Sequence, residues 1–174
     1  MQADSTAQAG GEDASRQRFL VDLSTLDLTQ RLVTREQLEL TNPHRGVMAL
    51  LDAVVWESHD RRQTVGVKHN RHDEFWCAGH FPGKPVLPGV LMIEALAQTA
   101  GLLAFKSGGK EINENSVVYF VGIDGARFKR PVVPGDQLRM EATVMRQTRG
   151  IWKFATKATV DGQLACEAEL MCTL

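Results

Sequence analysis

The sequence predicts an α+β domain in which one antiparallel sheet of about six strands wraps around a single long helix. Three observations lead to this prediction. Residues 90–105 (VLMIEALAQTAGLLAF) are apolar on all faces, which indicates a buried helix. The second half of the chain alternates apolar and polar residues over several short runs. Turn signals separate these runs, among them Pro134-Gly135 and Asp161-Gly162.

The expected strands follow from these runs and their turns. They cover residues 47–57, 61–69, 116–133, 136–147, 151–160 and 163–174. A curved sheet covers only one side of an all-apolar helix. The uncovered side and an exposed sheet edge therefore predict a second subunit.

The chain before this domain divides into two parts. Residues 1–18 are small and polar and read as a disordered tail, and residues 19–33 form an N-terminal extension able to pack on the surface. The main domain then spans 34–174. Thr34 followed by Gln37 has the spacing of a capping box, which predicts a short helix at its start.

Composition limits the functional classes. The 174 residues suit one domain with a sizeable core, and 20 basic against 21 acidic residues give a net charge of −1. Nothing global therefore favours a nucleic acid or an anionic membrane as partner. Three cysteines form no disulfide framework, so we expect a reducing, cytoplasmic location. The longest apolar run, 86–105, is interrupted by Pro88, Gly89, Glu94 and Gln98 and predicts no membrane span.

Glu94 is a carboxylate inside the most apolar helix, with Gln98 one turn further on the same face. One interpretation is structural: Glu94 faces outward or pairs with a basic side chain, as glutamates in helices commonly do. The other is chemical, because burial raises the pKa of a carboxyl group and makes it a general acid near neutral pH.

His80 lies in a stretch stiffened by prolines that leads to Pro88-Gly89, the start of the helix. A lone histidine is weak evidence for catalysis, but here it comes with two other groups. The unpaired amide of Gly89 at a helix start suits a developing oxyanion. A base, an acid and an amide together suit abstraction of a proton next to a thioester carbonyl, with loss of a β-hydroxyl as water.

The stretches GHFPGKPVLPGVLMIEALAQ and YFVGIDGARFKRPVVPGDQL resemble the β-hydroxyacyl-[acyl carrier protein] dehydratases of type II fatty acid synthesis. The resemblance covers roughly residues 34–173. It implies a hot-dog fold, dimerised through a continuous sheet, and a hydro-lyase that converts (3R)-hydroxyacyl-[acyl carrier protein] to the trans-2-enoyl form. Glutamate at position 94, where the related dehydratase-isomerases carry aspartate, favours plain dehydration.

The resemblance also assigns roles to residues. It implies that His80 is the base and Glu94 the acid, and that the two face each other across the dimer interface. Gly89 matches the oxyanion amide, and the carbonyl of Val86 matches the group that orients the histidine ring. Phe81 and Gln98 are expected to shape the site.

No metal or redox cofactor is expected, because the substrate is carried on the phosphopantetheine of acyl carrier protein. Arg127, Lys129 and Arg130 form a local basic cluster. They are either solvated strand-end charges or a docking patch for that acidic carrier. The expected assembly is a homodimer or a trimer of dimers.

Two other functions remain open for a chain with this fold. A hot-dog acyl thioesterase or a non-catalytic acyl-thioester binding subunit would share the same fold. His69, His72, Asp73 and Glu74 are too loosely spaced to favour a metal site, and Cys77 is expected to be a small buried thiol. Gly46-Val47 replaces an aromatic-proline pair that is usual after "PHR", which bears on acyl-chain preference and assembly.

Overall fold

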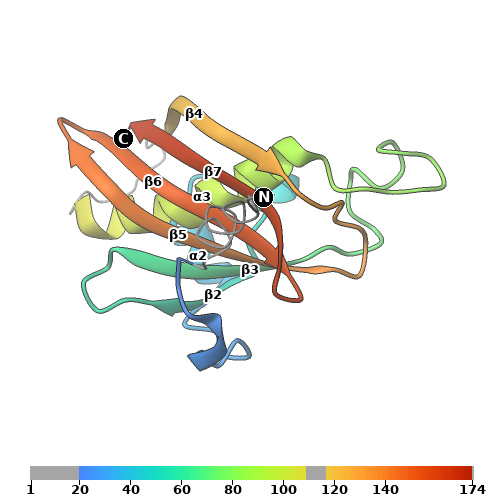
Figure 1. Cartoon of the computed structure of the whole chain (residues 1–174), viewed down its shortest axis with the longest axis horizontal. Coiled ribbons are helices and arrows are strands. Elements are labelled where there is room, and N and C mark those ends of the chain that lie inside the picture. The colour runs from blue at the N-terminus through green and yellow to red at the C-terminus, as the bar shows by residue number, and fades with distance from the viewer. Residues whose placement is uncertain (1–19, 109–116, 174) are drawn as a thin grey trace, which may run out of the picture.

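A computed structural model describes residues 20–108 and 117–173 and has the predicted architecture, one antiparallel sheet curved around one long helix (Figure 1). The expected tail at residues 1–18 lies outside the described residues. The described sheet has seven strands in the order β1-β2-β3-β5-β6-β7-β4, and all pairs are antiparallel. The helix α3 (Gly89–Gly108) runs behind the sheet in this view.

The longer strands follow the predicted runs, but the strand expected over 116–133 covers only Tyr119–Phe128. Beyond Phe128 the chain runs on without strand structure, and Val132 O accepts from Leu87 N in the loop before α3. The strand bounds are β1 (Val33–Thr34), β2 (Ala53–Glu57), β3 (Gln63–His69), β4 (Tyr119–Phe128), β5 (Gln137–Thr148), β6 (Ile151–Val160) and β7 (Gln163–Thr173). The strand beyond the expected six is β1, which is only two residues long and pairs with β2.

The strand expected over 47–57 begins only at Ala53, and residues 46–48 form a 3₁₀ turn, η2 (Gly46–Met48). Gly46 has a φ of 57°, in the left-handed region where glycine is favoured. After Gly46, the Gln98 side chain donates to the carbonyl of Met48 and accepts from the N–H of Leu50. These groups are therefore bonded to α3 and not to a neighbouring strand.

Two local predictions are confirmed. Helix α2 (Arg35–Thr41) begins with a capping box in which Thr34 accepts from the backbone of Gln37 and the Gln37 side chain accepts in return. The turn between β6 and β7 has positive φ at both Asp161 and Gly162, 50° and 76°, as a tight hairpin of this kind requires.

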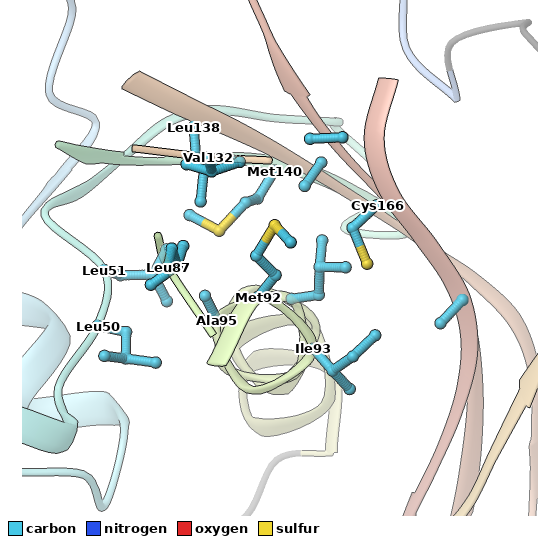
Figure 2. Close-up of a cluster of buried hydrophobic side chains, with 14 of the residues drawn as sticks. Leu50, Leu51, Leu87, Met92, Ile93, Ala95, Val132, Leu138, Met140 and Cys166 are labelled. Atoms are coloured by element: carbon cyan, nitrogen blue, oxygen red, sulfur yellow. The ribbon is translucent and has the colours of Figure 1, made fainter. Parts of the chain in front are cut away.

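The main core lies between α3 and the concave face of the sheet (Figure 2). Met92 on α3 and Met140 on β5 point into the space between the helix and the sheet, and Cys166 on β7 lies in the same cluster. Strand β3 approaches α3 closely at Gly66, where a methyl group would lie 3.1 Å from Thr99 Oγ1 on α3 and 2.5 Å from a carbon of the Leu51 side chain. Among the described residues, only Gly89–Lys106 of α3 has the length and apolarity of a membrane span. These 18 residues are 67% buried in this structure, as expected of a helix that packs in the core.

A second apolar cluster covers the opposite face of the sheet. Val21 and Leu23 of the N-terminal extension pack on outward-facing residues of β2 and β3, which are Ala53, Val55, Val65 and Val67. The backbone N–H of Val21 donates to Glu141 Oε2 at 2.9 Å, and the Glu141 side chain is fully buried beneath the extension. The extension therefore closes the outer face of β2, β3 and β5.

Candidate active site

His80 lies in the loop between β3 and α3 and is held by three bonds. Its backbone N–H donates to Trp76 O (2.9 Å), and its carbonyl accepts from Val86 N (2.7 Å). Its ring Nδ1 lies 2.7 Å from Val86 O. A carbonyl only accepts, so Nδ1 carries the hydrogen and Nε2 keeps its lone pair. The ring is therefore oriented with its basic nitrogen away from Val86.

Phe81 stacks on the His80 ring, with the centroids 4.2 Å apart, and its own side chain is 56% exposed. Gly89 is the first residue of α3, so its N–H has no acceptor within the helix. A methyl group at this position would lie 2.9 Å from the Phe128 ring at the end of β4. Glycine is thus the residue that lets the Phe128 ring lie against the helix start.

Glu94 lies five residues after Gly89 on α3, and its side chain is 20% exposed. Gln98 Nε2 donates to Glu94 Oε1 at 2.9 Å, and His44 Nε2 lies 3.0 Å from the same oxygen. Burial raises the pKa of Glu94, but the bonds from His44 and Gln98 and the charge of His44 outweigh burial and hold the pKa below its ordinary value. Of the two interpretations of Glu94, its lowered pKa favours pairing with a basic side chain, here His44, over a pKa raised by burial.

Gln98 is buried, and its amide is used in three directions. Oε1 accepts from Leu50 N (2.9 Å), and Nε2 donates to Met48 O (2.7 Å) as well as to Glu94. Gln98 therefore fastens the segment after η2 to α3 and orients Glu94 at the same time.

Within one chain, His80 and Glu94 are not joined by a hydrogen bond or an ion pair among the described residues: His80 bonds to Val86, and Glu94 to His44 and Gln98. His44 was not singled out in the sequence. It follows α2 by three residues and is 50 residues from Glu94, a separation that no local pattern reveals.

The basic cluster lies at the end of β4, with Arg127 inside the strand and Lys129 and Arg130 just after it. It lines a surface groove of about 1030 Å³ together with the acidic Asp124, Glu167 and Glu169. Arg130 is partly engaged, because its guanidinium lies 3.5 Å from Asp136 Oδ2 and 3.2 Å from Gln163 Oε1. Arg127, Lys129 and Arg130 thus share one groove, but its charge is mixed.

The acidic and histidine-rich stretch at 69–74 is bonded within the protein. Glu74 pairs with Lys68 at 2.7 Å and with Arg71 at 3.4 Å, and Gln137 Nε2 lies 3.1 Å from His69 Nε2. In residues 20–108 and 117–173, no group of three or more potential ligands gathers in metal-binding geometry. Cys77 is partly buried, with its thiol 3.5 Å from Arg71 O.

Comparison with known proteins extends this picture. The FabA-like domain matches residues 42–169, which is most of the chain. The chain belongs to the FabA-like family. It is 54% identical over 153 residues to a 3-hydroxyacyl-[acyl-carrier-protein] dehydratase FabZ from Janthinobacterium sp. (strain Marseille), covering 87% of this chain and 92% of that protein. The dehydratase FabZ of Nitrosospira multiformis is 54% identical over 132 residues, covering 76% of this chain and 90% of that protein.

Solved structures support the hot-dog fold of this family member. The dehydratase heterocomplex ApeI:P from Xenorhabdus doucetiae aligns with a TM-score of 0.66 at 18% identity, over 78% of this chain and 89% of that one. The E. coli PaaI protein aligns with a TM-score of 0.53 at 13% identity, over 70% and 81%. At these identities the likeness concerns the fold alone.

Proposed function

We propose that this protein dehydrates (3R)-hydroxyacyl-[acyl carrier protein] to trans-2-enoyl-[acyl carrier protein] in fatty acid biosynthesis. The extensive identity with FabZ dehydratases supports the reaction class. The observation that carries the chemistry is the His80 Nδ1–Val86 O bond, because it presents Nε2 as a base.

The elimination then needs only protons and a polarising amide. Nε2 of His80 takes the α-proton, and the electron pair of that C–H bond moves toward the thioester carbonyl. The N–H of Gly89 stabilises the developing oxyanion. The Cβ–O bond breaks as Glu94 gives its proton to the hydroxyl, which leaves as water. The steps require no metal or redox cofactor.

Glu94 must hold a proton at the moment of elimination, although its pKa in the single chain is lowered. A partner chain and a bound substrate would cover the 20% of the Glu94 side chain that is exposed. The loss of water would raise the pKa of Glu94 and favour its neutral, protonated form. In the reverse direction, hydration, the carboxylate form is the useful one, because it accepts a proton from the attacking water.

We propose that the site is shared between two copies of the chain. Strand β4 lies at the edge of the sheet and pairs only with β7 in the described chain. It exposes a dense set of apolar side chains, namely Tyr119, Phe120, Val121, Ile123 and Phe128. Pairing β4 with a second β4 would bury these side chains and continue the sheet, with His80 facing Glu94 of the partner.

We further propose that acyl carrier protein docks at Arg127, Lys129 and Arg130, where the acidic carrier finds its opposite charge. The three cysteines are free thiols, which supports a cytoplasmic location alongside the carrier. Assembly of dimers into trimers of dimers remains a prediction.

One assay tests the reaction. The protein is incubated with a 3-hydroxyacyl thioester and, separately, an enoyl thioester, while the ultraviolet absorbance of the conjugated enoyl group and the free thiol are both recorded. Dehydration changes the absorbance and releases no thiol. Release of thiol would indicate a thioesterase, and no change in either signal would indicate a binding subunit.

Two variants test the assigned roles. His80→Ala and Glu94→Gln should each lower kcat at least about 10²-fold, the scale of lost acid–base catalysis. His59→Ala, at an exposed histidine in the β2–β3 turn, is the matched control and should keep wild-type activity. Near-normal turnover in either site variant would remove that residue from the mechanism.

A further inference from the structure

His44 contacts the proposed acid in a way that the assigned mechanism leaves unexplained. Its Nε2 lies 3.0 Å from Glu94 Oε1. A carboxylate only accepts hydrogen bonds, so Nε2 must carry a hydrogen. The other ring nitrogen, Nδ1, is buried with no hydrogen-bond partner in the described chain. Glu94 is thus the one hydrogen-bonding group that holds this ring among the described residues.

The two bonds to Glu94 both end on one oxygen. Gln98 Nε2 donates to Oε1 from one helical turn away, and His44 Nε2 approaches Oε1 from the segment after α2. In the described chain no hydrogen bond reaches Oε2. Two donors that reach the same oxygen from different elements restrict its position more firmly than one donor does.

The segment that carries His44 is itself fastened to α3. Asn42 Nδ2 donates to Gln98 O at 3.2 Å, and Arg45 Nη1 donates back to Asn42 O at 2.6 Å. Asn42 is only 4% exposed, so this anchor lies inside the protein. His44 is consequently presented to Glu94 by a rigid support and not by a free loop.

We propose that His44 is a positioning residue which, together with Gln98, clamps Oε1 of Glu94 and leaves Oε2 as the oxygen that exchanges a proton with the substrate. This inference rests on the proposed dehydration. In the elimination, the O–H bond at Oε2 breaks, the proton joins the leaving hydroxyl, and the resulting charge is stabilised at Oε1 by the two donors.

The test compares His44→Ala, His44→Gln and the control His59→Ala in the dehydration assay. Losing the clamp should lower kcat about 10- to 100-fold in His44→Ala with little change in KM, since the carboxyl group becomes misplaced rather than removed. His44→Gln keeps an N–H donor near the position of Nε2 and should recover part of that loss. Equal kcat in His44→Ala and His59→Ala, or no recovery in His44→Gln, would overturn the proposal.

A second readout does not depend on activity. The carboxyl carbon of Glu94 is titrated by NMR in the wild type and in His44→Ala. Removing the donor should move the titration midpoint to higher pH, because the bond to His44 favours the charged carboxylate. An unchanged midpoint would reject the contact itself. A shifted midpoint in a protein without dehydratase activity would instead keep the contact and reject the proposed function.

Discussion

Gln98→Leu should destabilise the protein strongly, because it removes a buried amide that satisfies two backbone groups. Gln98 is 3% exposed, and its side chain accepts from the N–H of Leu50 and donates to the carbonyl of Met48. Leu50 is 1% exposed, so its N–H left without a partner costs about 1–3 kcal/mol, whereas the carbonyl of Met48, a residue that is 40% exposed, can bond water and adds less. The added apolar surface of leucine offsets only part of this cost.

Urea unfolding at one fixed protein concentration measures the effect, since the proposed assembly would make stability depend on concentration. For a chain of this size, about 1 kcal/mol corresponds to about 2–4 °C in Tm, so a thermal scan should show a drop of several degrees. The control is Gln147→Leu, at an exposed position on β5, which should stay within about 0.5 kcal/mol of the wild type. A Gln98→Leu protein as stable as the control would refute the reasoning.

Three further predictions concern buried positions that take no part in the proposed chemistry. Burial raises the pKa of Glu141 above its ordinary value of 4.5, despite the bond from the extension. The stability that the Glu141 carboxyl group contributes is therefore full below pH 4.5 and is lost as pH rises through the pKa of Glu141 in the folded protein. In Glu141→Gln, the free energy of unfolding measured with urea between about pH 4 and 8 should no longer show this loss. Burial raises the pKa of Cys166 to about 12 and of Cys172 to about 11, so both should resist alkylation at neutral pH until the protein unfolds; rapid labelling of either in the native state would contradict their burial. Gly66→Ala places a methyl group 2.5 Å from Leu51 and 3.1 Å from Thr99 Oγ1 on α3, and it should cost about 1–3 kcal/mol by denaturant unfolding. An unchanged midpoint would mean that β3 does not lie this close to Leu51 and α3.

Much of the fold could be predicted because its signals are local. The apolar run at 90–105 became the core helix, with its start at Gly89 and its end at Gly108. The alternation along β5 matched its burial, with Leu138, Met140 and Ala142 all fully buried. The capping box at Thr34 was also visible, because both partners lie within four residues.

The predictions that failed depend on contacts between distant segments. The first long strand begins at Ala53, since Gln98 draws the preceding backbone toward the helix. The lowered pKa of Glu94 depends on a histidine 50 positions away, so it fits the interpretation that Glu94 pairs with a basic side chain, although the sequence did not identify that partner. The packing of the extension over Glu141 was equally hidden, because a buried carboxylate in a strand looks like any solvent-facing residue until its cover is known.

The central claim is that each active site takes His80 from one chain and Glu94 from another. The most direct measurement mixes inactive His80→Ala and Glu94→Gln proteins under conditions that exchange subunits, with mixed dimers verified by native mass spectrometry. Half of the dimers would then be mixed and each would hold one intact site, so about a quarter of wild-type activity should return. No recovery in a sample that contains mixed dimers would contradict the shared site.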